Sequence, residues 1–147
     1  LVRDVIPQIN VHFGLKMERF GLTRGCAVLC CIYLFPRFNK ILLWTFNGQN
    51  FCFHGYVPIE ENKKTNFFKE IQINIKKKQE TQIFIETPYR NNKLLTDIMK
   101  IDNDSLKLCV ATNLTDTNQT ITSKTIKQWR QNKTPDLSKK LCIFLLN

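Results

Sequence analysis

The segment between residues 81 and 111 constrains the fold of this chain more than any other part of it. A short apolar run, residues 81–85, stops abruptly at the polar sequence Glu86-Thr-Pro-Tyr-Arg90. Residues 91–101 then carry apolar side chains at helical spacing, and residues 106–111 form a second short apolar run. Strand, helix and strand at this length predict a crossover connection between two parallel strands.

Polar residues follow each of these two strands, and their positions indicate where a functional site would lie. Residues 86–90 follow the first strand, and residues 112–116 follow the second. Parallel strands place their carboxyl ends at the same edge of a sheet, where the ligands of α/β proteins collect. If the two strands are near neighbours, both polar segments line that edge.

From residue 46 onward the chain alternates between predicted strands and helices. Ser123 is expected to be the N-cap of the last helix, which carries Ile126 and Trp129 and ends at Asn132. The other expected elements are strands at residues 51–57, 119–122 and 141–146 and a helix at residues 60–78. Together these patterns predict a mixed α/β domain with a mostly parallel sheet of about five strands and about three helices.

Residues 1–45 do not follow this alternation. Residues 26–35 are apolar but have neither strand nor helix periodicity, and the sequence begins with Leu1. One interpretation is a truncated product with an out-of-frame segment before Thr45, and the other is a genuine variable extension. The predicted domain therefore comprises residues 46–147, and residues 1–45 are left unassigned.

Composition limits the class of protein. The chain has 147 residues, 43% hydrophobic and 23% charged, which is typical of one globular domain. No apolar run approaches the roughly 20 residues that span a bilayer, so no membrane partner is expected.

Three of the six cysteines lie in strand-like apolar runs, which predicts reduced thiols in the cytoplasm rather than disulfides. The spacing of the cysteines and of the two histidines does not match a zinc site, so no metal is expected.

The formal net charge of +10 favours an acidic partner, with nucleic acid ahead of a membrane surface. A solubility role alone would also account for this charge. A cluster of lysines around the 60–78 helix favours the functional interpretation. Its members are Lys63, Lys64, Lys69, Lys76, Lys77 and Lys78.

Three segments, in order, resemble the C-terminal domain of the tetrapyrrole methylase superfamily, whose members are methyltransferases that use S-adenosylmethionine (SAM). Residues 46–58 are similar to the segment that opens that domain. Phe84-Ile-Glu-Thr-Pro-Tyr-Arg90 resembles the family sequence Glu-Ala-Pro-His-Arg, with Tyr89 in place of His. Ala111-Thr-Asn-Leu-Thr115 resembles Ala-Arg-Glu-Leu-Thr, and residues 143–146 match the last strand. The most similar branch is the bacterial small-subunit ribosomal RNA cytidine 2′-O-methyltransferase.

The resemblance implies that this chain is the C-terminal portion of a SAM-dependent methyltransferase. In the family the cofactor lies between two domains, and residues 1–45 lack the Gly-rich loops of the first. The resemblance further implies RNA, ribosomal RNA first, as the partner, ribose 2′-O-methylation as the reaction, and a homodimer as the assembly. The residues it places against the cofactor are Glu86, Pro88, Arg90, Asn113 and Thr115. It assigns no catalytic base.

Each of these residues also has a purely structural interpretation. Glu86 and Arg90 are four apart around a turn and could pair with each other. Pro88 could simply end the strand, while Asn113 and Thr115 could form a local turn. Two other functions stay open for the chain: a basic RNA-binding or degenerate domain without activity, and methylation of a tetrapyrrole.

Overall fold

The structure, a computed structural model, describes residues 50–114 and 116–147. The chain divides into two compact units, Leu1–Leu34 and Phe35–Asn147, and all the described residues belong to the second. The interpretations of residues 1–45 and the prediction for Thr115 therefore lie outside the described residues.

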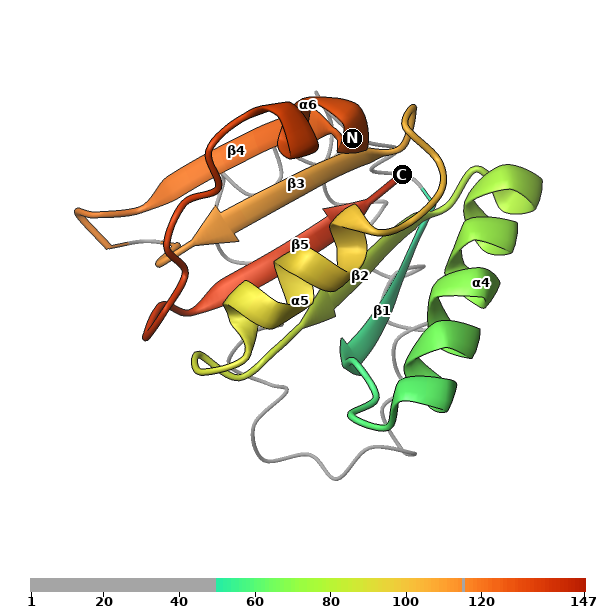
Figure 1. Cartoon of the computed structure of the whole chain (residues 1–147), viewed down its shortest axis with the longest axis horizontal. Coiled ribbons are helices and arrows are strands. Elements are labelled where there is room, and N and C mark those ends of the chain that lie inside the picture. Colours follow the sequence, from blue (N-terminus) through green and yellow to red (C-terminus); the bar gives the residue numbers. More distant parts are fainter. Residues whose placement is uncertain (1–49, 115) are drawn as a thin grey trace, which may run out of the picture. The chain divides into compact units, whose positions relative to one another are not determined.

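A five-stranded sheet forms the centre of the described region, in the order β1-β2-β5-β3-β4 (Figure 1). Its strands are β1 (Phe51–Tyr56), β2 (Thr81–Ile85), β3 (Lys107–Thr112), β4 (Thr120–Thr125) and β5 (Cys142–Leu146). All residues of β2 and β5 are buried, as are those of β3 after Lys107, which accounts for their nearly continuous apolar sequences.

The sheet is mixed, and the prediction of a mostly parallel sheet is wrong in this detail. Strands β1 and β2 pair in parallel, whereas β5 is antiparallel to both β2 and β3, and β3 is antiparallel to β4. The reason is that β5, the last strand of the chain, inserts between β2 and β3. Strands β2 and β3 nevertheless run in the same direction, one on either side of β5. The predicted mixed α/β class with five strands and three helices is confirmed for the described region.

Three helices, α4 (Glu61–Lys78), α5 (Asn91–Met99) and α6 (Ile126–Gln131), pack on one face of this sheet. Helix α4 buries Lys64, Phe68 and Ile71, which are spaced four and three residues apart and so share one side of the helix. Its C-cap is Gln79, whose backbone is left-handed at φ 50° and whose N–H donates to the carbonyl of Ile75.

Helix α6 begins later than predicted, because β4 continues to Thr125 along its partner β3. Ser123 is consequently a strand residue, and its prediction as the N-cap is wrong. Thr125 caps the helix: its hydroxyl accepts from the N–H of Gln128, and the Gln128 side chain accepts from the N–H of Thr125. This reciprocal pair satisfies two backbone donors that the first turn would otherwise leave open.

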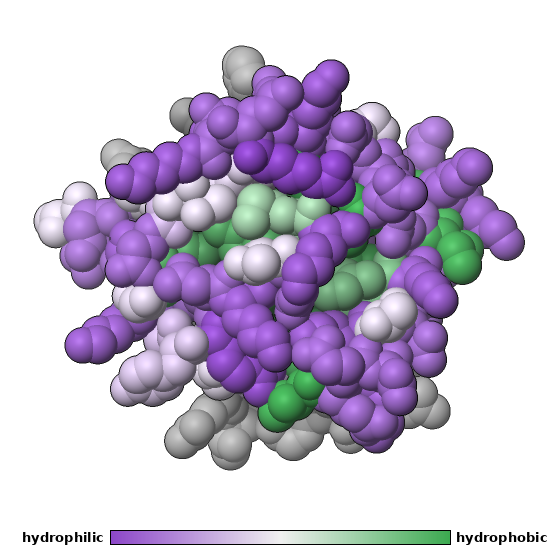
Figure 2. Space-filling view, in the orientation of Figure 1, coloured by the Kyte–Doolittle hydropathy of each residue, from purple (hydrophilic) through white to green (hydrophobic). Residues whose placement is uncertain are grey.

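The main core lies between the helices and the sheet. Phe84 of β2 stacks on Phe144 of β5, with ring centroids 5.9 Å apart. Trp129 of α6 is buried there, and its indole N–H donates to the carbonyl of Leu108 at 3.0 Å. Hydrophilic side chains cover most of the helical side, with apolar surface visible between them (Figure 2).

Candidate functional site

The carboxyl ends of β2 and β3 lie at the same edge of the sheet. Ile85 at the end of β2 pairs with Ile143, and Thr112 at the end of β3 pairs with Cys142. Both strand ends therefore meet the start of β5. The two polar segments that follow them share one edge, as the sequence predicts, although one strand separates them.

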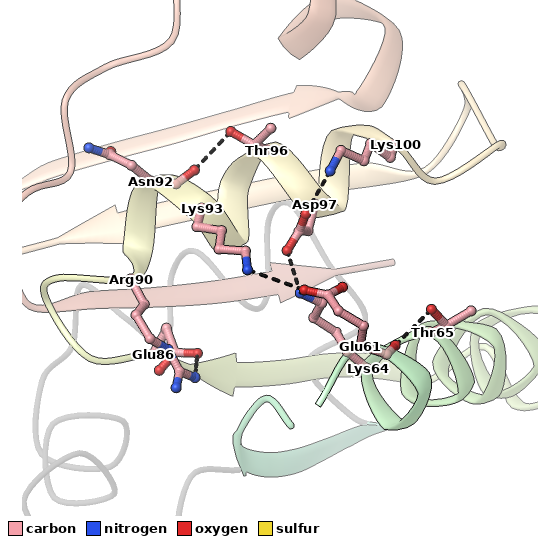
Figure 3. Close-up of polar contacts among 10 residues, drawn as sticks. All are labelled: Glu61, Lys64, Thr65, Glu86, Arg90, Asn92, Lys93, Thr96, Asp97 and Lys100. Carbon is pink, nitrogen blue, oxygen red and sulfur yellow. Dashed lines mark hydrogen bonds and ion pairs between the residues drawn. The ribbon is translucent and has the colours of Figure 1, made fainter. Parts of the chain in front are cut away.

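Glu86 and Arg90 pair directly, in the first of these segments. Oε2 of Glu86 accepts from Nη2 of Arg90 (Figure 3). Oε1 accepts from the N–H of Thr87 at 2.7 Å. The Glu86 side chain is 4% exposed and that of Arg90 is 32% exposed. Glu86 and Arg90 therefore do pair with each other, as the purely structural interpretation expects. The pairing orients the guanidinium group of Arg90, which still reaches the protein surface at this edge of the sheet.

Pro88 and Tyr89 occupy the turn between Glu86 and Arg90. The turn is closed by a hydrogen bond from the N–H of Arg90 to the carbonyl of Thr87 at 2.9 Å, and Pro88 fits its second position because its φ is fixed. Tyr89 is 86% exposed. The turn thus directs an aromatic side chain outward beside Arg90.

Asn113 has a local structural role at the end of β3. Its backbone is left-handed at φ 46°, a conformation that asparagine tolerates better than most residues. Its N–H donates to the carbonyl of Leu141 at 2.8 Å, and its Oδ1 accepts from the N–H of Leu141 at 3.1 Å. Its Nδ2 donates to Oδ1 of Asn118 at 3.1 Å. Asn113 therefore fastens its loop to the segment that precedes β5.

A small open pocket of about 60 Å³ lies on the same edge, between the β1–α4 connection and α5. Val57, Glu86, Arg90 and Lys93 are among its lining residues. Pockets that enclose small-molecule ligands measure roughly 300–1,000 Å³, so this one alone does not enclose a ligand the size of SAM.

Two carboxylates and three lysines connect α4 to α5 beside this pocket (Figure 3). Lys64 of α4 donates to Asp97 of α5 at 2.7 Å and to Glu61 at 2.9 Å. Lys93 also contacts Glu61, at 3.2 Å, and Lys100 contacts Asp97 at 2.9 Å. The side chains of Lys64 and Asp97 are only 9% and 10% exposed, so this pair is largely removed from water.

The charges of this pair are mutually stabilised. Hydrogen bonds to Asp97 and Glu61 raise the pKa of Lys64 above its usual value, against the effect of burial. Burial by itself would raise the pKa of Asp97, but hydrogen bonds from Lys64 and Lys100 outweigh it and hold that pKa below its usual value. Both groups are therefore charged at neutral pH.

Sequence reasoning missed the Lys64–Asp97 pair. It counted Lys64 in the lysine cluster that favours an acidic partner, and in this respect it was wrong, because Lys64 is buried. A signal was present in the spacing: Lys64 is in phase with Phe68 and Ile71 on the apolar side of α4. A lysine in an apolar stripe requires a buried acid, and Asp97 supplies it.

Asn91, at the first position of α5, is fully buried behind the edge. Its Nδ2 donates to the carbonyl of Lys140 at 2.8 Å and to that of Leu137 at 3.5 Å. Its Oδ1 is buried and has no donor among the described residues. This acceptor would be satisfied by a buried water or by a donor from a bound molecule.

The described cysteines are reduced and buried. Burial raises the pKa of Cys109 to about 12, and burial, partly offset by Lys140, raises that of Cys142 to about 11.

Within residues 50–114 and 116–147, no cluster of three metal-ligating side chains occurs, and no helix is long and apolar enough to cross a membrane. His54 contacts Gln82 at 2.6 Å, and its ring packs edge-on against Phe67, which is partly buried.

A comparison with protein families finds no match, and neither does a comparison with curated proteins. Among solved structures, the chain matches one described as the crystal structure of the methyltransferase CobJ, with 13% sequence identity and a TM-score of 0.43. The match covers 68% of this chain and 41% of that one, so the chain spans about two fifths of its length. A likeness this distant carries no argument about function.

Proposed function

We propose that this chain is part of a SAM-dependent methyltransferase and that the carboxyl edge of β2 and β3 forms one side of its cofactor site. One observation carries the proposal. The two segments that resemble the family signatures, Phe84–Arg90 and Ala111–Thr115, are far apart in sequence, yet the strands that lead into them end at the same edge on either side of β5.

The residues at this edge fit one side of such a site. Arg90 presents a partly exposed guanidinium, which can bind a carboxylate through two parallel hydrogen bonds. Glu86 and Asn113 act as positioning residues, because their polar atoms hold Arg90 and the β3 loop in place. Pro88 stiffens the first loop, and Thr115 is retained as a proposed contact on the strength of the resemblance.

In this proposal SAM supplies an activated methyl group, and the chain supplies binding and orientation. Methyl transfer of this kind depends mainly on holding two reactants in line, so fixed loops matter more than reactive side chains. A ribose hydroxyl acceptor would also require a base, and we assign none among the described residues.

For the acceptor we propose the ribose of ribosomal RNA, as the resemblance implies. The net charge of +10 supports a polyanionic substrate. A tetrapyrrole with several carboxylates would suit the same charge, and it is the second acceptor to test. Incubating the chain with SAM labelled in its methyl group and with either ribosomal RNA or a tetrapyrrole would distinguish the two by the product that becomes labelled.

A domain without catalytic activity is the second candidate function. It is favoured by the internal use of the polar atoms of Glu86 and Asn113 and by the small size of the pocket. Such a domain would bind RNA through its charge and would not bind SAM.

Calorimetry with SAM and S-adenosylhomocysteine distinguishes these functions. We expect both compounds to bind the intact chain and the Arg90→Ala variant to bind about tenfold more weakly or worse, a loss of at least about 1.4 kcal/mol. Lys69→Ala, on the exposed side of α4, is the control and should bind like the parent chain. Absence of binding to the parent chain contradicts the methyltransferase proposal, and equal binding by the Arg90 variant removes Arg90 from it.

A further inference from the structure

The side of the sheet opposite the three helices is largely apolar in its middle. Strand pairing aligns the side chains there into two rows, and a further row on this side carries the polar residues Thr81, Lys107 and Thr125. The first row is Phe53, Ile83, Leu145, Cys109 and Ser123, and the second is Tyr56, Ile85, Ile143, Ala111 and Ile121. We call these ten residues the rear face. Ser123 is its single polar member.

No helix of the described region packs on the rear face. The helices α4, α5 and α6 pack instead against Phe84, Val110, Phe144 and their neighbours, whose side chains point to the other side of the sheet. In Figure 1, α5 and α6 both lie in front of the strands. A sheet that is apolar on both sides is stable only when both sides are covered.

Burial within the rear face is uneven. Ile83, Cys109 and Leu145, in the middle of the first row, are fully buried. Tyr56 and Ile121, at the two ends of the second row, are 54% and 38% exposed. Water is therefore excluded from the centre of the rear face and reaches its ends, which is the pattern expected for a cover narrower than the sheet.

We propose that residues 41–46 of this chain cover the rear face. Their sequence, Ile41-Leu-Leu-Trp-Thr-Phe46, is apolar except for Thr45, and it ends shortly before Asn50, whose carbonyl accepts from the N–H of Thr81 beside β1. These residues belong to the same compact unit as the sheet, Phe35–Asn147.

The length of the connection is sufficient. Five strands spaced about 4.8 Å apart make a sheet roughly 20 Å wide. Residues 42–50 reach roughly 25 Å when extended, at about 3.3 Å per residue. The segment can therefore lie across the strands without a longer connection.

Cys109 provides a direct test, because it is the one thiol of the rear face, whereas Cys142 belongs to the core on the helical side. Both thiols are buried, and their pKa values, about 12 and about 11, are similarly high.

In the intact chain, N-ethylmaleimide labelling mapped by mass spectrometry should find both protected. With Leu43→Ser and Trp44→Ser together, labelling of Cys109 should rise at least about tenfold while Cys142 stays protected. Ile73→Ser, at an exposed position of α4, should change neither. Unchanged protection of Cys109 in the double variant would overturn the proposal.

A second measurement decides the case in which both thiols become reactive because the variant unfolds. A photo-crosslinking benzoylphenylalanine in place of Trp44, in the otherwise unchanged chain, should crosslink within the same molecule to peptides containing β2 or β5. Crosslinks between two molecules would assign the rear face to a second copy and overturn the proposal, as would intramolecular crosslinks elsewhere or none. SAM takes no part in either experiment, so their failure would leave the proposed function untouched.

Discussion

At the scale of single residues, the buried pair of Lys64 and Asp97 influences the candidate site more than its few atoms suggest. It ties the first turn of α4 to α5, and α5 directly follows the polar segment at the end of β2, which lies at the edge. Charges held out of water cost free energy unless each has a close partner, so each residue of the pair makes the other tolerable. The arrangement of this edge of the sheet thus depends on the buried contact between Lys64 and Asp97.

Lys64→Met should destabilise the protein by about 3–5 kcal/mol, because it leaves the Asp97 carboxylate buried with a weaker set of partners. Urea unfolding followed by tryptophan fluorescence would measure this loss. Lys100→Met is the matched control: Lys100 also contacts Asp97, but its side chain is 70% exposed. Its loss should cost less than about 1 kcal/mol. Equal effects of the two substitutions would show that burial does not set the strength of these pairs.

The same pair predicts a pH dependence. Asp97 has a lowered pKa in the folded state, so its contribution to stability is present above its unfolded pKa, near 3.8, and is lost as the pH falls through its folded pKa. The difference in unfolding free energy between the parent chain and Asp97→Asn should therefore be large at pH 7 and shrink steadily as the pH is lowered below about 4. Urea titrations at a series of pH values would test this, and a difference that does not vary with pH would contradict it.

At the scale of elements, the boundary between β4 and α6 shows how strand pairing fixes the start of a helix. Both Ser123 and Thr125 are residue types that cap helices, and only the pairing of β4 with β3 as far as Thr125 distinguishes them. Thr125→Ala should cost about 1 kcal/mol of unfolding free energy, whereas Ser123→Ala should cost less than about 0.5 kcal/mol. Thermal unfolding of the two variants would compare them, and a larger effect at Ser123 would restore the original assignment.

Most elements were predictable from the sequence because their signals are local. The helix that carries Phe68 and Ile71 and the strand that ends at Glu86 both follow from side-chain periodicity and turn residues. The environment of Lys64 was not predictable in the same way, because its partner Asp97 lies on another helix. The internal role of Asn113 also depends on a distant partner, Leu141. Residues whose function rests on distant contacts were the ones that sequence reasoning misplaced.

At the scale of the whole molecule, the strand order was the least accessible feature. Strands β2, β3 and β5 all have nearly continuous apolar sequences, and nothing local says which of them lies in the centre. The insertion of β5 makes the sheet mixed, yet it preserves the relation on which the proposed function depends. Because β5 is antiparallel to both neighbours, β2 and β3 still point to one edge.

The central claim is that the loops after β2 and β3 act together as one side of a cofactor site. The measurement that tests it most directly is a titration of the isotopically labelled chain with S-adenosylhomocysteine, followed by amide chemical shifts. The account predicts that the amides of residues 86–90, apart from Pro88, and of residues 112–116 shift together, with a single affinity. Shifts confined to the opposite edge of the sheet, at residues 76–80 and 104–107, or no shifts at all, would contradict it.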